Sequence, residues 1–192
     1  MPGKRPDTQF RREIREFNRE FLDLVCNDPR SGTAFGLPPA IRERLVLLTP
    51  AQLETIADTP CLLVGFLVLP PAVPPAGVAE ASVPGVEPAP HLVATRVYAA
   101  ALLTWLWHTA RQDPLLAALC IGPGRGRVEQ LASAGFRDLQ RGVAFAAECL
   151  EARFCRHPRI WPDLVRAVSR ADAQVLMATH LSALQLTLVS RG

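Results

Sequence analysis

The sequence predicts an all-α protein, built from two similar small helical units that a proline-rich segment joins. Apolar residues recur at helical spacing near the start, prolines gather in one central stretch, and short motifs return about 85 residues apart. We expect residues 1–69 and 92–192 to form the units and residues 70–91 to form the linker. Of the 192 residues, 49% are hydrophobic and 20% are charged, which excludes intrinsic disorder for most of the chain.

The first expected helix covers residues 9–26 and carries a single apolar stripe. Charged residues separate the members of the stripe, which are Phe10, Ile14, Phe17, Phe21 and Leu24. The stripe is interpreted either as packing within its own unit or as a seam for a second helix, in a dimer or in a partner protein. Asn27-Asp28-Pro29 is expected to end the helix, because the residue before a proline is disfavoured in helical geometry.

Further elements of the first unit follow from capping and turn residues. A second helix is expected to start near Pro38 and to run to about Leu48. Thr49 is then a good N-cap and Pro50 a good first helical residue, so a third helix is expected from Pro50. The apolar run from Cys61 to Leu69 can form a short buried strand. The linker begins at Pro70 and favours extended chain, because residues 70–90 hold seven prolines.

The second unit repeats landmarks of the first. Asp28-Pro29 and Phe35-Gly36-Leu37-Pro38 return as Asp113-Pro114 and Cys120-Ile121-Gly122-Pro123, and an apolar helix from Val93 to Arg111 precedes the second copy. If the chain is duplicated, it resembles a dimer fused by its linker. Such a pseudo-dimer can bury the apolar stripe between its own two units and stay monomeric. If the stripe is instead exposed, we expect a homodimer.

The charge pattern and the cysteines say more about where the protein is located than about which ligand it binds. The net charge of +3 is too small to require a nucleic-acid partner. Residues 1–20 mix basic and acidic side chains, which excludes a secretory signal, and prolines interrupt the uncharged stretch Thr59–Ala79. The uncharged stretch Ala173–Val189 contains several polar residues and is expected to be an amphipathic helix, so no membrane association is predicted. The five cysteines lack a disulfide pattern and indicate a reduced, cytoplasmic protein.

Arginines in the second unit are the candidate DNA-binding residues, because arginine can neutralise and grip phosphates. The alternative is a solvated helix face with scattered ion pairs. The candidate DNA-binding residues are Arg125, Arg127, Arg137, Arg141, Arg153, Arg156 and Arg159. Trp105 and Trp107, on the expected helix Val93–Arg111, are interpreted as core residues or as an aromatic anchor at a partner interface.

The residues needed for enzymatic or metal chemistry do not form a recognisable pattern. Cys149, Cys155 and His157 lack the paired spacing and the fourth ligand of a zinc site. The glycine-rich run Gly122–Gly126 lacks the Gly-Lys-Ser/Thr ending of a phosphate loop and is expected to be a plain loop. We therefore expect no catalytic residue, no bound metal and no cofactor.

Two segments resemble the D subunit of the bacterial flagellar master activator. In the first unit, Phe21–Leu37 is similar to the end of that family's long first helix and its aspartate-containing turn, and Leu48–Leu63 contains its Leu-Thr-x-x-Gln helix as Leu48-Thr-Pro-Ala-Gln52. Near the end of the chain, Arg153–Leu164 follows the family's order of Arg-Phe, His, Ile and Leu, with one extra residue.

The resemblance implies a helical, cytoplasmic transcription regulator that dimerises and binds promoter DNA together with a zinc-containing C-type partner subunit. The chain departs from the family in three ways, one of which is its doubled length with a proline-rich join. Gly36, and Ile121 in the second unit, replace the family's arginine after the loop phenylalanine, and Val64 replaces a cysteine that forms an intersubunit disulfide. A different class stays open, a helical adaptor or secretion-apparatus protein that binds other proteins and not DNA through two apolar helices, Phe10–Leu24 and Val97–Trp107.

Overall fold

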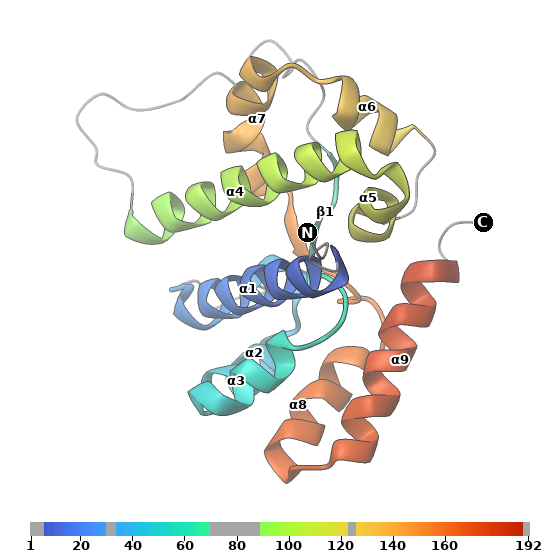
Figure 1. Cartoon of the computed structure of the whole chain (residues 1–192). Helices are drawn as coiled ribbons and strands as arrows, with labels where there is room; N and C mark the ends of the chain where they lie inside the picture. The colour runs from blue at the N-terminus through green and yellow to red at the C-terminus, as the bar shows by residue number, and fades with distance from the viewer. Residues whose placement is uncertain (1–5, 30–33, 70–88, 123–125, 190–192) are drawn as a thin grey trace. The chain divides into compact units, whose positions relative to one another are not determined.

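The computed structural model describes residues 6–29, 34–69, 89–122 and 126–189. Over these ranges the chain forms nine α-helices, one short 3-10 helix and one two-stranded sheet (Figure 1). The all-α class expected from the sequence is therefore confirmed. The chain divides into a terminal unit, made of residues 1–64 and 152–189, and an inserted unit, made chiefly of residues 65–151.

The terminal unit joins the beginning of the chain to its end. Helix α1 packs against α2 and α3, and α8 packs against α2, α3 and α9. The bounds are α1 Pro6–Asn27, 3-10 helix η1 Ala34–Gly36, α2 Pro39–Val46, α3 Pro50–Ala57, α8 Ile160–Arg170 and α9 Ala173–Val189. Helix α1 buries Ile14, Phe21 and Val25 on one face. Its charged residues remain at the surface, as the apolar spacing predicts.

A buried asparagine fixes the segment that follows α3. Asn18 on α1 is fully buried, and its Nδ2 lies within hydrogen-bond distance of the carbonyl oxygens of Ala57 (3.2 Å), Thr59 (3.3 Å) and Cys61 (3.0 Å). Its Oδ1 accepts a bond from the backbone N–H of Leu63 at 2.7 Å. A buried polar side chain is tolerated when its bonds are satisfied, so Asn18 can hold this irregular chain against α1.

Helix α3 begins as the sequence predicts, with Thr49 as its N-cap. The Thr49 Oγ1 accepts a bond from the Gln52 backbone N–H, and the Gln52 Oε1 accepts one from the Thr49 backbone N–H, which completes a capping box. The Gln52 Nε2 also donates to the Val168 carbonyl oxygen at 3.2 Å. One glutamine therefore caps α3 and links it to α8.

Among the residues that the structure describes, the inserted unit forms four helices, with the long helix α4 packed against the other three. They are α4 Pro90–Gln112, α5 Pro114–Ile121, α6 Arg127–Ser133 and α7 Phe136–Glu148. Asp113 separates α4 from α5, and its Oδ1 caps α5 by accepting bonds from the backbone N–H groups of Leu115 and Leu116. Helix α4 buries Leu102, Leu103 and Leu106.

The two units meet in the chain at a short sheet. Strand β1, Val64–Phe66, pairs with strand β2, Leu150–Ala152, and the boundary between the units falls within both strands. The flanking bonds run from Arg153 N–H to the Leu63 oxygen and from Leu67 N–H to the Cys149 oxygen, each at 2.8 Å. Their register makes the pair antiparallel. The expected strand in Cys61–Leu69 is therefore present, in a shorter form.

The observed units differ from the two expected ones, residues 1–69 and 92–192. Residues 152–189 pack with the N-terminal segment because α8 buries an apolar face against α2 and α3. This contact joins residues more than 100 positions apart, such as Gln52 and Val168, and helical periodicity gives no sign of it. The internal duplication is not confirmed. Residues 70–88 of the expected linker lie outside the described residues.

Candidate functional site

Both segments that resemble the D subunit lie in the terminal unit. Phe21–Leu37 and Leu48–Leu63 contribute the end of α1, η1 and α3, while Arg153–Leu164 contributes a turn and the start of α8. Within the second segment Ile160, Trp161 and Leu164 are fully buried. The similar residues are therefore largely core residues of one unit, although about 90 residues of chain separate the two segments.

Three candidate DNA-binding arginines share the turn between β2 and α8. Arg156 and Arg159 are exposed, and the half-buried Arg153 places its guanidinium 5.3 Å from the Phe154 ring centre. The Trp161 Nε1 donates to the Arg153 carbonyl oxygen at 2.7 Å and ties the turn to the first turn of α8. The turn therefore presents a short basic surface on a fixed backbone.

The other candidate arginines belong to the inserted unit and are not equivalent to one another. Arg127 is half-buried and donates from Nη2 to the Phe66 carbonyl oxygen at 3.1 Å, and burial lowers its pKa. Arg137 and Arg141 are exposed on α7, where Arg141 lies 3.6 Å from the Asp138 carboxylate. Arg125 lies outside the described residues. Arg127 thus has a structural role. The ion pair between Arg141 and Asp138 on α7 is typical of a solvated helix face.

The apolar stripe of α1 is divided between core and partly exposed positions. Ile14 and Phe21 are buried, and the Phe21 ring meets the Phe35 ring edge-on with a centroid distance of 5.4 Å. Phe10, Phe17 and Leu24 are half-buried. Packing within the unit accounts for the first pair, and the interface interpretation stays a prediction for the other three.

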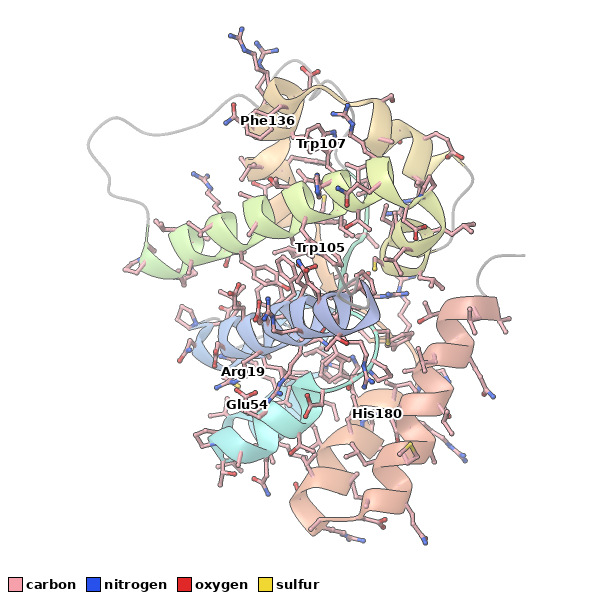
Figure 2. The ribbon with its side chains drawn as sticks, in the orientation of Figure 1. Arg19, Glu54, Trp105, Trp107, Phe136 and His180 are labelled. Carbon is pink, nitrogen blue, oxygen red and sulfur yellow. The ribbon has the colours of Figure 1, made fainter. Side chains whose placement is uncertain are left out.

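The tryptophans of α4 are both half-buried, and one belongs to a small aromatic cluster. The Trp107 Nε1 donates to the Ala134 carbonyl oxygen at 3.0 Å, and the ring lies 6.2 Å from that of Phe136 (Figure 2). The Arg111 guanidinium lies over the same indole at 4.9 Å. Trp107 therefore helps join α4 to α7 within the inserted unit, and an interface role for Trp105 stays a prediction.

An ion-pair network links α1 to α3 and was not identified from the sequence. Arg15 contacts Glu54 at 2.9 Å and Asp58 at 3.1 Å, while Arg19 contacts Glu54 at 2.9 Å and Asp23 at 2.5 Å. Arg19 and Glu54 point toward each other in Figure 2. The hydrogen bond from Arg15 lowers the pKa of Glu54, and the same bond raises the pKa of Arg15. Only the i,i+4 pair Arg19–Asp23 has a local sequence signal.

Two shallow grooves lie along this charged side of α1, with volumes of about 390 and 380 Å³. Arg12 and Arg15 line both of them. Acidic side chains compensate the arginines of the first groove, which is lined by Arg12, Arg15, Glu16, Arg19, Glu20 and Glu54. Burial, followed by the charges of Glu16 and Asp23, raises the pKa of Glu20. The network is thus organised as a clamp between helices rather than as an anion site.

The cysteines and histidines do not converge on a reactive centre. All five cysteines are thiols, and burial raises the pKa of Cys26, Cys61 and Cys149, which disfavours their nucleophilic thiolate form. Within residues 6–29, 34–69, 89–122 and 126–189, no group of three or more His, Cys, Asp or Glu side chains is placed to hold a metal ion. The histidine with a defined side-chain contact across the terminal unit is His180, whose Nε2 lies 3.3 Å from the Thr59 Oγ1.

Helix α9 corrects one sequence expectation. It was expected to be amphipathic, but its buried residues, Thr179, Ala183 and Thr187, are not its most apolar ones. Met177 and Leu181 are instead exposed, at 61% and 53%. Threonine hydroxyls can be buried here because each donates to the carbonyl oxygen four residues earlier, at 2.7 and 2.9 Å. Spacing alone did not reveal which face of an uncharged helix is inward.

Comparison of the chain with protein-family models, curated proteins and solved structures finds no match. In the part of the chain that the structure describes, no helix combines the length and the apolar character needed to cross a bilayer.

Proposed function

We propose that the chain is a nonenzymatic transcription regulator of the flagellar-activator D type, which acts by assembly with a C-type partner subunit. The observation that carries this proposal is the grouping of the two D-like segments, Phe21–Leu63 and Arg153–Leu164, in one compact unit. This grouping supports the proposal, because the inserted unit separates the two segments in the chain while both belong to the same compact unit.

The D-like residues also have definite roles within that unit. Thr49 and Gln52, from the Leu-Thr-x-x-Gln motif, form the capping box of α3, and Gln52 extends to the carbonyl oxygen of Val168 on α8. Ile160 and Leu164, from the second segment, are buried in α8. These contacts support a shared scaffold, on which an activator subunit would present its partner-binding surfaces.

Promoter DNA would contact the turn that holds Arg153, Arg156 and Arg159. The last two are exposed, and the backbone bond to Trp161 limits the movement of the turn. A backbone that is already ordered adds no ordering cost on binding, so mainly the arginine side chains lose conformational freedom when they bind phosphate oxygens. This contact replaces the one lost at Gly36, where the family carries arginine.

The decisive experiment is co-expression of the tagged chain with the C-type subunit from the same genome. The purified protein is assayed for the second subunit and for binding to a labelled flagellar promoter fragment at low and high salt. We expect a stable complex that binds the fragment more tightly at low salt, because phosphate contacts release counterions. Absence of the C-type subunit from the purified protein, under conditions that recover the chain itself, would contradict the proposal.

Charge reversal in the turn tests the DNA contact separately. Replacing Arg153, Arg156 and Arg159 by glutamate should abolish retention of the fragment at low salt. Because Arg153 also stacks on Phe154, the double variant R156E/R159E is the cleaner test. The matched control is R11E/R44E, which reverses two exposed arginines elsewhere in the terminal unit. Equal DNA retention by the two double variants would refute a contact at the turn while leaving assembly with the C-type subunit intact.

A second function, that of a helical adaptor that binds proteins and not DNA, is favoured by the exposed apolar side chains of α9. Its distinguishing result is recovery of a protein complex, with promoter binding that equals the binding to a fragment of unrelated sequence. That outcome would reject the DNA-binding part of the first proposal.

A further inference from the structure

The second of the two grooves along α1 has an unbalanced charge. It lies within the terminal unit, between the first turns of α1 and the chain that follows α3, and has a volume of about 380 Å³. Among the described residues that line it, three are arginines, Arg11, Arg12 and Arg15, and one is a carboxylate, Asp58. Two positive charges are therefore left over, whereas the first groove is lined by equal numbers of arginines and glutamates.

The three arginines of this groove differ in how firmly they are held. Arg15 lies between two carboxylates, at 2.9 and 3.1 Å. Arg12 contacts Glu16 at 3.5 Å, but the two side chains are 67% and 63% exposed, so this pair adds little stability. In the described part of the chain no carboxylate lies within ion-pair distance of Arg11. Arg11 and Arg12 are therefore free to turn toward an anion, beside an Arg15 that is already fixed.

The spacing of these arginines is unfavourable when the groove is empty. Arg11 and Arg15 are four residues apart on α1, so their side chains share one face of the helix, and like charges at this spacing destabilise a helix. Arg12 adds a third positive charge beside them. An anion bound between the arginines would remove this repulsion.

The remaining lining residues indicate the size and polarity of a ligand. The exposed Thr8 carries a hydroxyl that can donate to an anion, and the half-buried Pro60 supplies an apolar wall. The volume of about 380 Å³ lies at the lower end of the roughly 300–1,000 Å³ of small-molecule sites. A matching ligand therefore combines an anionic group with a small apolar part.

We propose that this groove binds a small organic phosphate. A phosphate monoester carries a charge of about −1.5 to −2 at neutral pH, which matches the two positive charges left over, whereas a carboxylate supplies one negative charge. The planar guanidinium group also binds phosphate oxygens through paired N–H groups. The phosphate contacts Arg11 and Arg12, and the organic part lies against Pro60. This site does not depend on the proposed regulator function.

The test titrates phenyl phosphate into the full chain at about pH 7.5 and measures its dissociation constant by isothermal titration calorimetry. Benzoate is the comparison ligand, because it has the same ring and one negative charge. We expect phenyl phosphate to bind about tenfold more tightly than benzoate. The double variant R11A/R12A should raise the dissociation constant of phenyl phosphate about tenfold or more, because it removes the two loosely held arginines. The matched control is R44A/R170A, which removes two exposed arginines elsewhere in the terminal unit and should change the constant less than about twofold.

A variant that gains affinity gives a result that misfolding cannot explain. Asp58→Asn removes the carboxylate of the groove and releases Arg15 from one of its two contacts, so it should lower the dissociation constant of phenyl phosphate about threefold or more. An unchanged constant would contradict the charge balance on which the proposal rests.

Three other results would overturn the proposal. The first is no saturable binding of phenyl phosphate up to about 10 mM. The second is equal affinity for phenyl phosphate and benzoate, or equal affinity of R11A/R12A and R44A/R170A for phenyl phosphate. The third is displacement of phenyl phosphate by an excess of duplex DNA, which would make the groove a DNA contact. None of these measurements involves the C-type subunit, so the phosphate site can fail while the proposed regulator function holds, and the reverse.

Discussion

Helices α8 and α9 pack against each other in the terminal unit (Figure 1). They differ in the side chains that they bury. Helix α8 buries Ile160, Trp161 and Leu164, and places Arg166 and Arg170 outside. Helix α9 buries Thr179, Ala183 and Thr187, and it exposes Met177, Leu181 and Leu188. The two helices are consecutive in the chain. The difference in the side chains that they bury therefore reflects what surrounds each helix in the fold.

The apolar side chains of α8 complete the core of the unit, whereas part of the apolar surface of α9 stays exposed. In α8 the charges fix the outward side, since Arg166 pairs with Asp163 at 2.8 Å on that side. In α9 no charge sets the orientation, and the side chains that are buried are the small ones of Thr179, Ala183 and Thr187. The large side chains of α8 therefore contribute to the core of the terminal unit, whereas Met177, Leu181 and Leu188 of α9 contribute little to it.

The sharpest test of this difference compares one leucine from each helix. Leu164→Ala should lower the free energy of unfolding by about 2–5 kcal/mol, because it leaves a cavity in a fully buried site. Leu181→Ala should change it by less than about 0.5 kcal/mol, because the side chain is 53% exposed. Both values come from urea unfolding followed by circular dichroism, at concentrations where the chain is monomeric. Equal losses for the two variants would remove the contrast.

The second test removes the link between α3 and α8. Gln52→Ala removes the side-chain half of the capping box, which is the bond to the Thr49 backbone N–H, together with the bond to the Val168 oxygen. It should cost about 1–2 kcal/mol of unfolding free energy. Gln9→Ala is the matched control, because Gln9 is an exposed glutamine whose bond runs to Glu13 on the same helix. If Gln52→Ala lowers the free energy of unfolding no more than Gln9→Ala does, α8 is held against α3 by apolar contacts alone.

Local signals in the sequence predicted the elements of the fold but not their assembly. Thr49 and Pro50 identified the start of α3, and the α1 stripe identified its buried face through Ile14 and Phe21. Such signals depend on residues close in sequence, whereas the contact between Gln52 and Val168 depends on the folded chain. The division into a terminal and an inserted unit was therefore missed.

The candidate surfaces follow the same pattern. Arg153, Arg156 and Arg159 were identified because they are near neighbours in sequence, and they share one turn. Arg127 was grouped with them by charge, but it is half-buried and bonded to the Phe66 oxygen, a role with no local signal. Asn18 gave no signal either, because its partners lie about 40 residues away.

A smaller effect is expected at the beginning of α8. Trp161→Phe keeps a large aromatic side chain but removes the Nε1 bond to the Arg153 oxygen, and should cost about 1 kcal/mol. The turn would then lose its anchor, so amide hydrogen exchange at residues 154–159 should become faster. Trp107→Phe is the control in the inserted unit, since it removes an equivalent bond to the Ala134 oxygen and should leave exchange in this turn unchanged. If Trp161→Phe leaves amide exchange at residues 154–159 unchanged, the bond from Trp161 Nε1 is not needed to hold the turn.

The smallest expected effect concerns the polar inner side of α9. Burial lowers the pKa of His180, and the charge of Asp58 opposes this shift only in part. The folded chain thus holds His180 neutral at a pH where the unfolded chain already protonates it. Its contribution is fully present above the unfolded pKa of about 6.5 and is lost as the pH falls toward the folded value. Urea midpoints at about pH 7.5 and about pH 5.5 should therefore differ less for His180→Gln than for the wild-type chain, whereas His108→Gln, at an exposed histidine, should keep the full difference. An unchanged difference in His180→Gln would mean that the inner side of α9 is hydrated, and that this helix is less closely packed than its neighbour α8.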